Sequence, residues 1–215
     1  LPLNPSPEQM QTLINLYNQG YHRQVIDQAK ILLHQFPNAA RLHELRGSVL
    51  VSLGQFDKAI DSYKYAIKIK PDFAEAYTNM GVALRKKGEL DAAIDSYKHA
   101  ISIKSDFAEA YSNMGNALKD KGNIGAAKTR YKQALKIKPD YAEAAFNLSG
   151  TSNDIFESKS WLEQCLKADK NHLKAKLHLA ALRYYAGDRS NFNNLMRSSF
   201  KDHPAMRSFA WAFNL

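Results

Sequence analysis

The 215-residue sequence lacks long hydrophobic runs and has almost no cysteine. Its apolar runs are a few residues long, whereas a helix needs about 20 apolar residues to cross a bilayer, so no membrane span is predicted. Cys165 is the single cysteine, which excludes an intrachain disulfide, and beside Leu162 and Leu166 it is expected to pack as a small side chain. A lone thiol fits a reducing compartment, so the predicted location is cytoplasmic.

Motifs for catalysis or metal binding are also absent from the sequence. The seven histidines form no HxxxH or HExxH pair, and there is neither a GxSxG sequence nor a phosphate-binding loop. Paired carboxylates such as Asp91 and Asp95 fit a solvated helix face better than acid–base catalysis. The sequence therefore predicts no enzyme, no metal site and no cofactor in this segment.

The sequence contains fewer acidic than basic residues. It has 21 aspartates and glutamates against 30 lysines and arginines, which gives a formal charge of +9. Such a balance raises nucleic acid or an anionic membrane as a partner. Many lysines, however, fall at the C-terminal ends of predicted helices, where cations complement the helix dipole. These helices are the second helices of the repeat described below, and the lysines are Lys68, Lys70, Lys104, Lys136 and Lys138. This structural explanation is favoured, and nucleic acid is the least favoured partner.

What the sequence does contain is a repeat. Residues 74–107 are followed by almost the same 34 residues at 108–141. Small or apolar residues recur in each at spacings of 3, 4 and 7, which place them on one helical face, and Gly88 and Gly122 mark a turn in the middle. The same period gives units at 6–39 and 40–73, a degenerate 31-residue unit at 142–172 and a unit at 173–206. Residues 207–215 then begin a further helix or a C-terminal cap.

The junctions between units carry their own helix stops and starts. Proline stands at position 32 of four units, where it ends the second helix; these residues are Pro37, Pro71, Pro139 and Pro204. Three aspartates followed by glutamate three residues later predict capping boxes; the pairs are Asp72 and Glu75, Asp106 and Glu109, and Asp140 and Glu143.

The pattern resembles the tetratricopeptide repeat (TPR), which has an aromatic residue at position 4, glycine at 8, small residues at 20 and 27, an aromatic residue at 24 and proline at 32. The match is most regular over residues 40–141. The resemblance implies an all-α fold, a right-handed superhelical solenoid of stacked helix-turn-helix repeats, with residues 1–215 forming a single array. Tyr63, Tyr97 and Tyr131 at position 24 are then expected to pack between helices.

The resemblance also implies that first-helix positions 2, 5, 6, 9, 12 and 13 line a concave groove. Position 6 is Asn79, Asn113 and Asn147, which resembles the asparagine ladder with which O-linked N-acetylglucosamine transferases hold an extended peptide backbone. Further predicted partner-binding residues are Asn116, Arg85, Lys86 and Lys119. The alternative is that asparagine at position 6 is only family background. The carboxylate clamp of chaperone-binding TPR proteins finds no match in Glu109 and Asn113, so chaperone binding is not predicted.

The main functional hypothesis is a non-catalytic protein–protein interaction scaffold that accepts a peptide or protein in the groove. One alternative is a homo-oligomer that assembles through its ends, with Phe209, Trp211 and Phe213 as the interface. Another is the recognition arm of a larger, transferase-type bacterial enzyme, because such arrays resemble those that precede transferase domains. A targeting segment or a catalytic domain outside residues 1–215 is left open. Nothing in the sequence names the partner.

Overall fold

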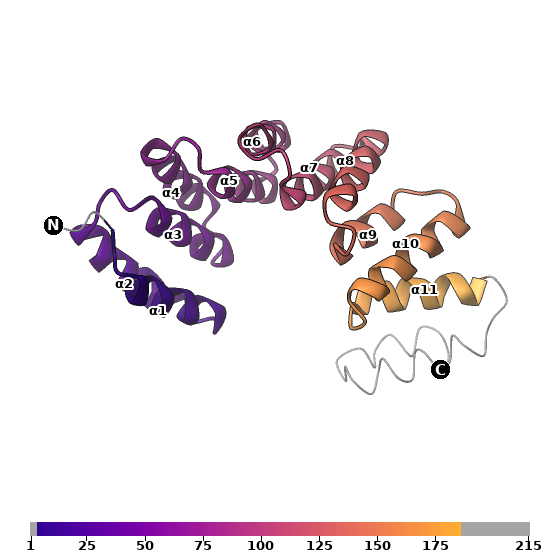
Figure 1. Ribbon diagram of the computed structural model, residues 1–215, viewed down its shortest axis with the longest axis horizontal. Helices are drawn as coiled ribbons and strands as arrows, with labels where there is room; N and C mark the ends of the chain where they lie inside the picture. Colours follow the sequence, from indigo (N-terminus) through magenta and orange to yellow (C-terminus); the bar gives the residue numbers. More distant parts are fainter. Residues whose placement is uncertain (1–3, 186–215) are drawn as a thin grey trace. The chain divides into compact units, whose positions relative to one another are not determined.

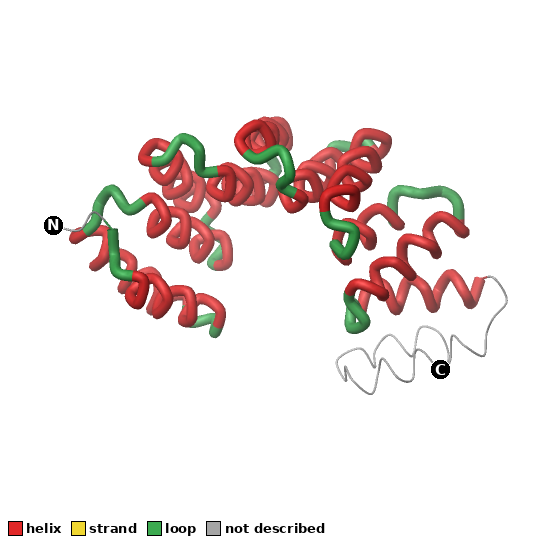
Figure 2. The backbone as a smooth tube through the Cα atoms, viewed as in Figure 1, coloured by secondary structure: helices red, strands yellow, loops and turns green. Residues whose placement is uncertain are grey.

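The computed structural model describes residues 4–185 of the chain. Within these residues it contains eleven α-helices joined by short loops and no β-strand (Figure 2). The predicted all-α fold of helix-turn-helix repeats is confirmed.

The helices belong to two compact units, Leu1–Asn123 and Ile124–Leu215, called unit 1 and unit 2. Unit 1 contains α1 (Pro7–Asn18), α2 (His22–Gln35), α3 (Ala40–Ser52), α4 (Phe56–Ile69), α5 (Ala74–Lys87), α6 (Leu90–Ile103) and α7 (Ala108–Asp120). Unit 2 contains α8 (Ile124–Ile137), α9 (Ala142–Ser149), α10 (Ile155–Ala168) and α11 (Leu173–Tyr185). The boundary between the units falls inside the predicted repeat 108–141, and a single array over the whole chain stays a prediction.

Successive helices of unit 1 form pairs, in which α1 packs against α2, α3 against α4 and α5 against α6 (Figure 1). The turn within each pair contains a glycine with positive φ: 81° at Gly20, 71° at Gly54 and 90° at Gly88. Glycine enters this left-handed region without the steric cost that a Cβ atom imposes. Glycine therefore recurs every 34 residues because each pair needs the same left-handed turn.

The two helices of a pair meet through a glycine on the first helix and a tyrosine on the second. A Cβ atom on Gly47 would lie 2.6 Å from Cε1 of Tyr63, and a Cβ atom on Gly81 would lie 2.6 Å from Cε1 of Tyr97. Both tyrosine side chains are buried, as is that of Tyr131. The missing side chain at position 8 lets the ring lie directly on the backbone of the first helix. The predicted packing role of these tyrosines is confirmed.

Two junctions between successive repeats of unit 1 combine helix packing with an ion pair. The second helix packs on the following first helix, α4 on α5 and α6 on α7. Nζ of Lys87 lies 2.7 Å from Oδ1 of Asp57, and Lys121 pairs in the same way with Asp91. Both partners of the second ion pair lie 34 residues after those of the first, so one link serves two junctions.

The helix starts differ from the predicted capping boxes. The N-cap residues of α5, α7 and α9 are Phe73, Phe107 and Tyr141, and none of them makes a side-chain capping hydrogen bond. The aspartates that were predicted to cap lie one residue too early. The prediction was wrong because packing of the aromatic side chain decides where the backbone turns into the helix; Phe73, for example, is buried.

Lysines at the ends of second helices contact the same aromatic residues. Nζ lies over the ring of the residue three positions later, at 5.2 Å for Lys70 over Phe73, 4.7 Å for Lys104 over Phe107 and 5.2 Å for Lys138 over Tyr141. These are cation–π distances. Part of the positive charge thus has a role within the fold, next to helix C-termini whose dipole it also complements.

Unit 2 contains the interruption that the sequence predicted. Its helix α9 is only eight residues long, and the following loop ends at Asp154, whose side chain caps α10. Nζ of Lys128 on α8 lies 2.8 Å from Oε2 of Glu157 on α10, and the Ser152 hydroxyl donates to the same oxygen over 2.5 Å. An ion pair therefore connects α8 to α10 across the shortened helix.

The Glu157→Gln variant is expected to be less stable than the wild type at neutral pH, by an amount that shrinks on acidification. The Lys128 ammonium and the Ser152 hydroxyl lower the pKa of Glu157 from 4.5 to about 2. A carboxylate with a lowered pKa in the folded state stabilises the fold above its unfolded pKa, and that contribution is lost as the pH falls from 4.5 toward about 2. Thermal unfolding followed by circular dichroism, from neutral pH to about pH 3, measures the difference.

Glu163→Gln in the same helix is the control for that measurement. Among residues 4–185, the shortest ion-pair distance of Glu163 is 3.9 Å, to Lys159, so removing its charge is expected to change the unfolding temperature less. A wild-type advantage over Glu157→Gln that stays constant down to about pH 3 would contradict the assigned role of the ion pair.

Candidate functional site

The first helices of successive repeats lie side by side in unit 1. α3 contacts α5 and α5 contacts α7, whereas α4 and α6 make no comparable contact. The repeats of unit 1 therefore curve toward their first helices. We call the surface formed by the exposed and half-buried side chains of α3, α5 and α7 the first-helix face.

A chain of polar side chains crosses this face, and we call it the Glu44 network. Nδ2 of Asn79 on α5 donates to Oε1 of Glu44 on α3 over 2.7 Å. The Ser48 hydroxyl, one turn after Glu44, donates to the same oxygen over 3.0 Å and lies 3.2 Å from the hydroxyl oxygen of Tyr63. Glu44, Ser48 and Asn79 are half-buried and Tyr63 is buried. The network joins three helices of two repeats.

Glu44 is the charged member of the network. Burial raises its pKa above the ordinary value, while hydrogen bonds from Ser48 and Asn79 and the charge of Arg41 act in the opposite direction; the charge of Glu75 again raises it. Burial is the largest of these effects on the pKa. The hydrogen bonds and the charge of Arg41 therefore only partly offset the free-energy cost of burying the negative charge.

Sequence reasoning missed Glu44 because this residue departs from the repeat. Position 5 is Thr78 in the next unit and Ser112 in the one after, and both of these side chains are buried. A carboxylate at this position therefore occurs in repeat 40–73 but not in the two that follow. The departure itself was visible in the sequence and could have identified the residue.

The three asparagines of the predicted ladder differ from one another. Asn79 is engaged with Glu44, whereas the half-buried Asn113 of α7 has no side-chain hydrogen bond within the described residues. Asn116, one turn later, is also half-buried. Asn147 belongs to unit 2, is 8% exposed, and its buried Nδ2 has no partner within the described part. The structure thus places Asn79 and Asn113 on one face of unit 1, and their contact with a ligand stays a prediction.

The predicted basic residues also differ. Nη1 of Arg85 on α5 lies 2.6 Å from Oδ2 of Asp120 on α7, so this side chain links two repeats. Lys86 is exposed and Lys119 is half-buried, and neither forms an ion pair with another described residue. These two lysines leave positive charge at the C-terminal ends of α5 and α7 for a ligand to contact.

Two glutamates that were predicted to take part in capping boxes belong instead to the candidate site, because the capping boxes do not form. Glu75 and Glu109 lie in the first turns of α5 and α7, where their charge complements the helix dipole. Glu75 is exposed and Glu109 is half-buried, and among the described residues neither makes a hydrogen bond or an ion pair. Their carboxylates are therefore available on the first-helix face.

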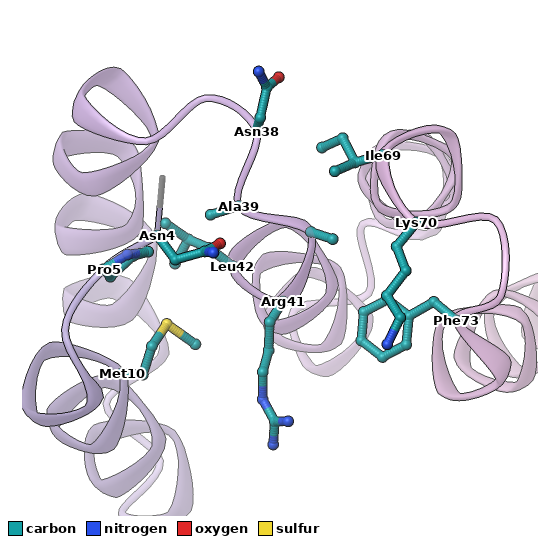
Figure 3. A pocket seen from close by; sticks show the side chains of 11 residues that line it. Asn4, Pro5, Met10, Asn38, Ala39, Arg41, Leu42, Ile69, Lys70 and Phe73 are labelled. Carbon is teal, nitrogen blue, oxygen red and sulfur yellow. The ribbon is translucent and has the colours of Figure 1, made fainter. Parts of the chain in front are cut away.

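A pocket of about 470 Å³ opens beside the N-terminal end of α3 (Figure 3). Most of its lining is apolar, and the polar Asn4 and Asn38 and the charged Arg41 and Lys70 complete it; the apolar residues are Pro5, Met10, Ala39, Ala40, Leu42, Ile69 and Phe73. Its volume is within the range of about 300–1,000 Å³ that is usual for ligand sites. The sequence analysis did not find it because three separate segments form it, 4–10, 38–42 and 69–73.

Other chemistry has little support in the part of the chain that the structure describes. No three His, Cys, Asp or Glu side chains between residues 4 and 185 lie close enough to hold a metal ion, and no helix there is long and apolar enough to cross a membrane. Cys165 is buried, which raises the pKa of its thiol to about 11 and fits the predicted packing role. The predicted interface residues Phe209, Trp211 and Phe213 lie outside the described residues.

These features define an array of stacked helix-turn-helix repeats with a polar inner face. The sequence model of the TPR repeat family matches at residues 47–88, 81–122 and 115–149. This part of the chain consists of tetratricopeptide repeats, and the predicted family is confirmed. The presence of these repeats supports the prediction that the chain is a protein-interaction scaffold. A comparison with curated proteins finds no match.

Solved structures of TPR proteins have similar folds. PilF of Pseudomonas aeruginosa matches with a TM-score of 0.78 and 14% identity, over 92% of this chain and 91% of that one. MamA matches with a TM-score of 0.62 and 24% identity, over 74% and 95% of the two chains. YrrB, described as a TPR protein with an unusual peptide-binding site, matches with a TM-score of 0.59 and 16% identity, over 87% and 98%. At these identities the likeness concerns the fold.

Proposed function

We propose that this chain is a non-catalytic scaffold in the cytoplasm that binds an extended peptide segment of a partner protein on the first-helix face. The observation that carries the proposal is Asn113, a half-buried amide on the inner side of unit 1 with no hydrogen-bond partner for its side chain among the described residues. An amide both donates and accepts, so it can pair with the main chain of a peptide whatever the sequence of that peptide. The peptide-binding site named for YrrB supports this reading of the shared fold.

Backbone contacts alone do not explain a useful affinity. Each hydrogen bond contributes roughly 0.5–1.5 kcal/mol, whereas a micromolar complex needs about 8 kcal/mol. The pocket of Figure 3 supplies room for an apolar side chain of the partner, which contributes about 1.5–3 kcal/mol when fully buried. Lys86 and Lys119 supply charge for acidic groups at the other end of the first helices. The partner is therefore proposed to insert an apolar side chain in the pocket while its backbone follows the first-helix face.

Selection of displayed random peptides against residues 1–215 tests this function. We expect enriched peptides, and we expect Asn113→Ala to weaken their binding by about two- to tenfold, because it removes a hydrogen bond of roughly 0.5–1.5 kcal/mol. Fluorescence anisotropy with the tightest peptide measures the change, after circular dichroism has shown that the variant is folded.

Lys98→Ala is the matched control, since Lys98 lies on the second helix α6 and, among the described residues, pairs only with Asp95 of the same helix. It is expected to bind the peptide within about twofold of the wild type, because exposed i,i+3 ion pairs contribute little. Failure to enrich any peptide would overturn the proposal, as would a peptide that loses affinity with Lys98→Ala and keeps it with Asn113→Ala.

A further inference from the structure

We propose that Glu44 and Asn79 form a subsite that selects a cationic side chain, arginine above lysine, in the peptide bound to the first-helix face. This inference rests on the proposed function and names the ligand chemistry at one place on that face. It also gives Asn79 a role different from that of a ladder residue, because its amide holds a carboxylate of the neighbouring repeat in place.

The hydrogen bonds leave mainly acceptors at this subsite. The amide of Asn79 and the hydroxyl of Ser48 both donate to Oε1 of Glu44, so two of the local donors are already used. Oε2 of Glu44 and Oδ1 of Asn79 receive no hydrogen bond from any described residue. A carboxylate oxygen and an amide oxygen on adjacent helices require donors from a ligand. A peptide carbonyl or carboxylate would meet mostly acceptors there.

The charges around Glu44 favour a cation in the same place. Burial leaves the carboxylate partly uncompensated, and Glu75 adds a second negative charge from α5. Arg41 is the nearby cation, but it is exposed and lies beyond ion-pair distance of Glu44. A guanidinium has several donors in one plane and loses hydration more easily than an ammonium, so it suits a half-buried acceptor pair better than lysine does.

The subsite is not repeated along the first-helix face. At the corresponding position of α5, the Thr78 hydroxyl donates to the carbonyl oxygen of Ala74 within its own helix, over 3.0 Å. On α7 the corresponding Ser112 is buried. Contacts to a peptide backbone could form in several registers. Among Glu44, Glu75 and Glu109, however, only Glu44 is held in place by hydrogen bonds from described side chains, those of Ser48 and Asn79. We infer that this pair fixes the register of the peptide.

The first test uses blocked single residues as probes. N-acetyl-arginine N-methylamide is titrated into ¹⁵N-labelled residues 1–215, with N-acetyl-citrulline N-methylamide as an uncharged probe of the same shape. We expect saturable chemical-shift changes at Glu44, Ser48 and Asn79 with the arginine probe, at millimolar concentrations, since one such contact supports roughly 4 kcal/mol at most. The citrulline probe is expected to bind at least about tenfold more weakly, which corresponds to about 1.4 kcal/mol.

Glu44→Gln and Glu109→Gln are the paired variants, since both remove one carboxylate from the first-helix face. Glu44→Gln is nearly isosteric and is expected to weaken the arginine probe at least about tenfold, whereas Glu109→Gln stays within about twofold. The inference is overturned by equal binding of arginine and citrulline, by equal loss in both variants, or by the absence of shifts at Glu44 up to about 50 mM probe, well above a millimolar dissociation constant.

The selected peptides separate this inference from the proposed function. We expect them to contain an arginine or lysine whose replacement by citrulline or alanine costs at least about tenfold in the wild type and little in Glu44→Gln. Peptides that bind through Asn113 and are indifferent to Glu44→Gln would leave the function standing and refute the subsite. Specific binding of the arginine probe without any enriched peptide would support the subsite and refute the proposed function.

Discussion

Replacing Gly81 with alanine is expected to lower the free energy of unfolding by about 2 kcal/mol, because overpacking a well-packed core costs about 1–3 kcal/mol. The new Cβ atom would lie 2.6 Å from Cε1 of Tyr97. That ring is buried, so it cannot turn out of the way without moving its neighbours. The substitution would otherwise gain up to about 1 kcal/mol in helix propensity, which the clash exceeds. Urea denaturation followed by circular dichroism measures the loss.

Gly125→Ala is the control, because beyond its chain neighbours and the backbone of its own helix no atom of the described residues lies within 4 Å of the new methyl group on α8. Its stability is expected to stay the same or to rise by up to about 1 kcal/mol. Gly47→Ala repeats the clash of Gly81→Ala, at 2.6 Å from Tyr63, and is expected to lose a similar amount. If Gly81→Ala is as stable as the wild type, the close approach of glycine and tyrosine is wrong.

Tyr63→Ala is expected to cost about 3–5 kcal/mol, the usual range for removing a large aromatic side chain from a core. The side chain is 1% exposed, and its ring fills the space above Gly47. Its hydroxyl oxygen also lies 3.2 Å from that of Ser48, so the Glu44 network loses a member. The measurement is again urea denaturation, with the peptide-binding assay as a second readout of the first-helix face.

Tyr65→Ala, two residues later on the same helix, is the matched control. This tyrosine is 59% exposed and contacts His43 with 5.5 Å between ring centroids. Its loss is expected to cost about 1 kcal/mol or less, as for a single surface aromatic pair.

In a Tyr63→Ala background, Gly47→Ala is expected to cost nothing further, because the atoms that clash are gone. Additive losses would show that the two positions do not share a contact.

The sequence was sufficient for those parts of the fold that depend on backbone sterics. The left-handed turn at Gly88 and the interruption after Ser149 follow from residue type and position. The starts of the first helices could not be predicted in the same way, since local N-cap preference favours Asp72 over Phe73. Burial of Phe73 decides between them, and burial is a property of the stacked repeats.

The site was predictable only where it follows the repeat. The repeat pattern singled out Asn79 at position 6, but it did not predict the hydrogen bond of Asn79 to Glu44. That bond, like the ion pair of Arg85 with Asp120, joins residues 35 positions apart. Such contacts depend on the distance between adjacent first helices and on side-chain rotamers, and neither is visible within a single repeat.

The ion pair that joins Lys87 to Asp57 and Lys121 to Asp91 has a consequence for how such a chain grows. Repeat 74–107 contains both halves of the link, Asp91 for the repeat that follows and Lys87 for the repeat that precedes. Tandem duplication of the segment therefore creates a fitting interface without any new mutation. Array length can then change during evolution by whole repeats, while residues outside the link diverge, as Glu44 has from Thr78.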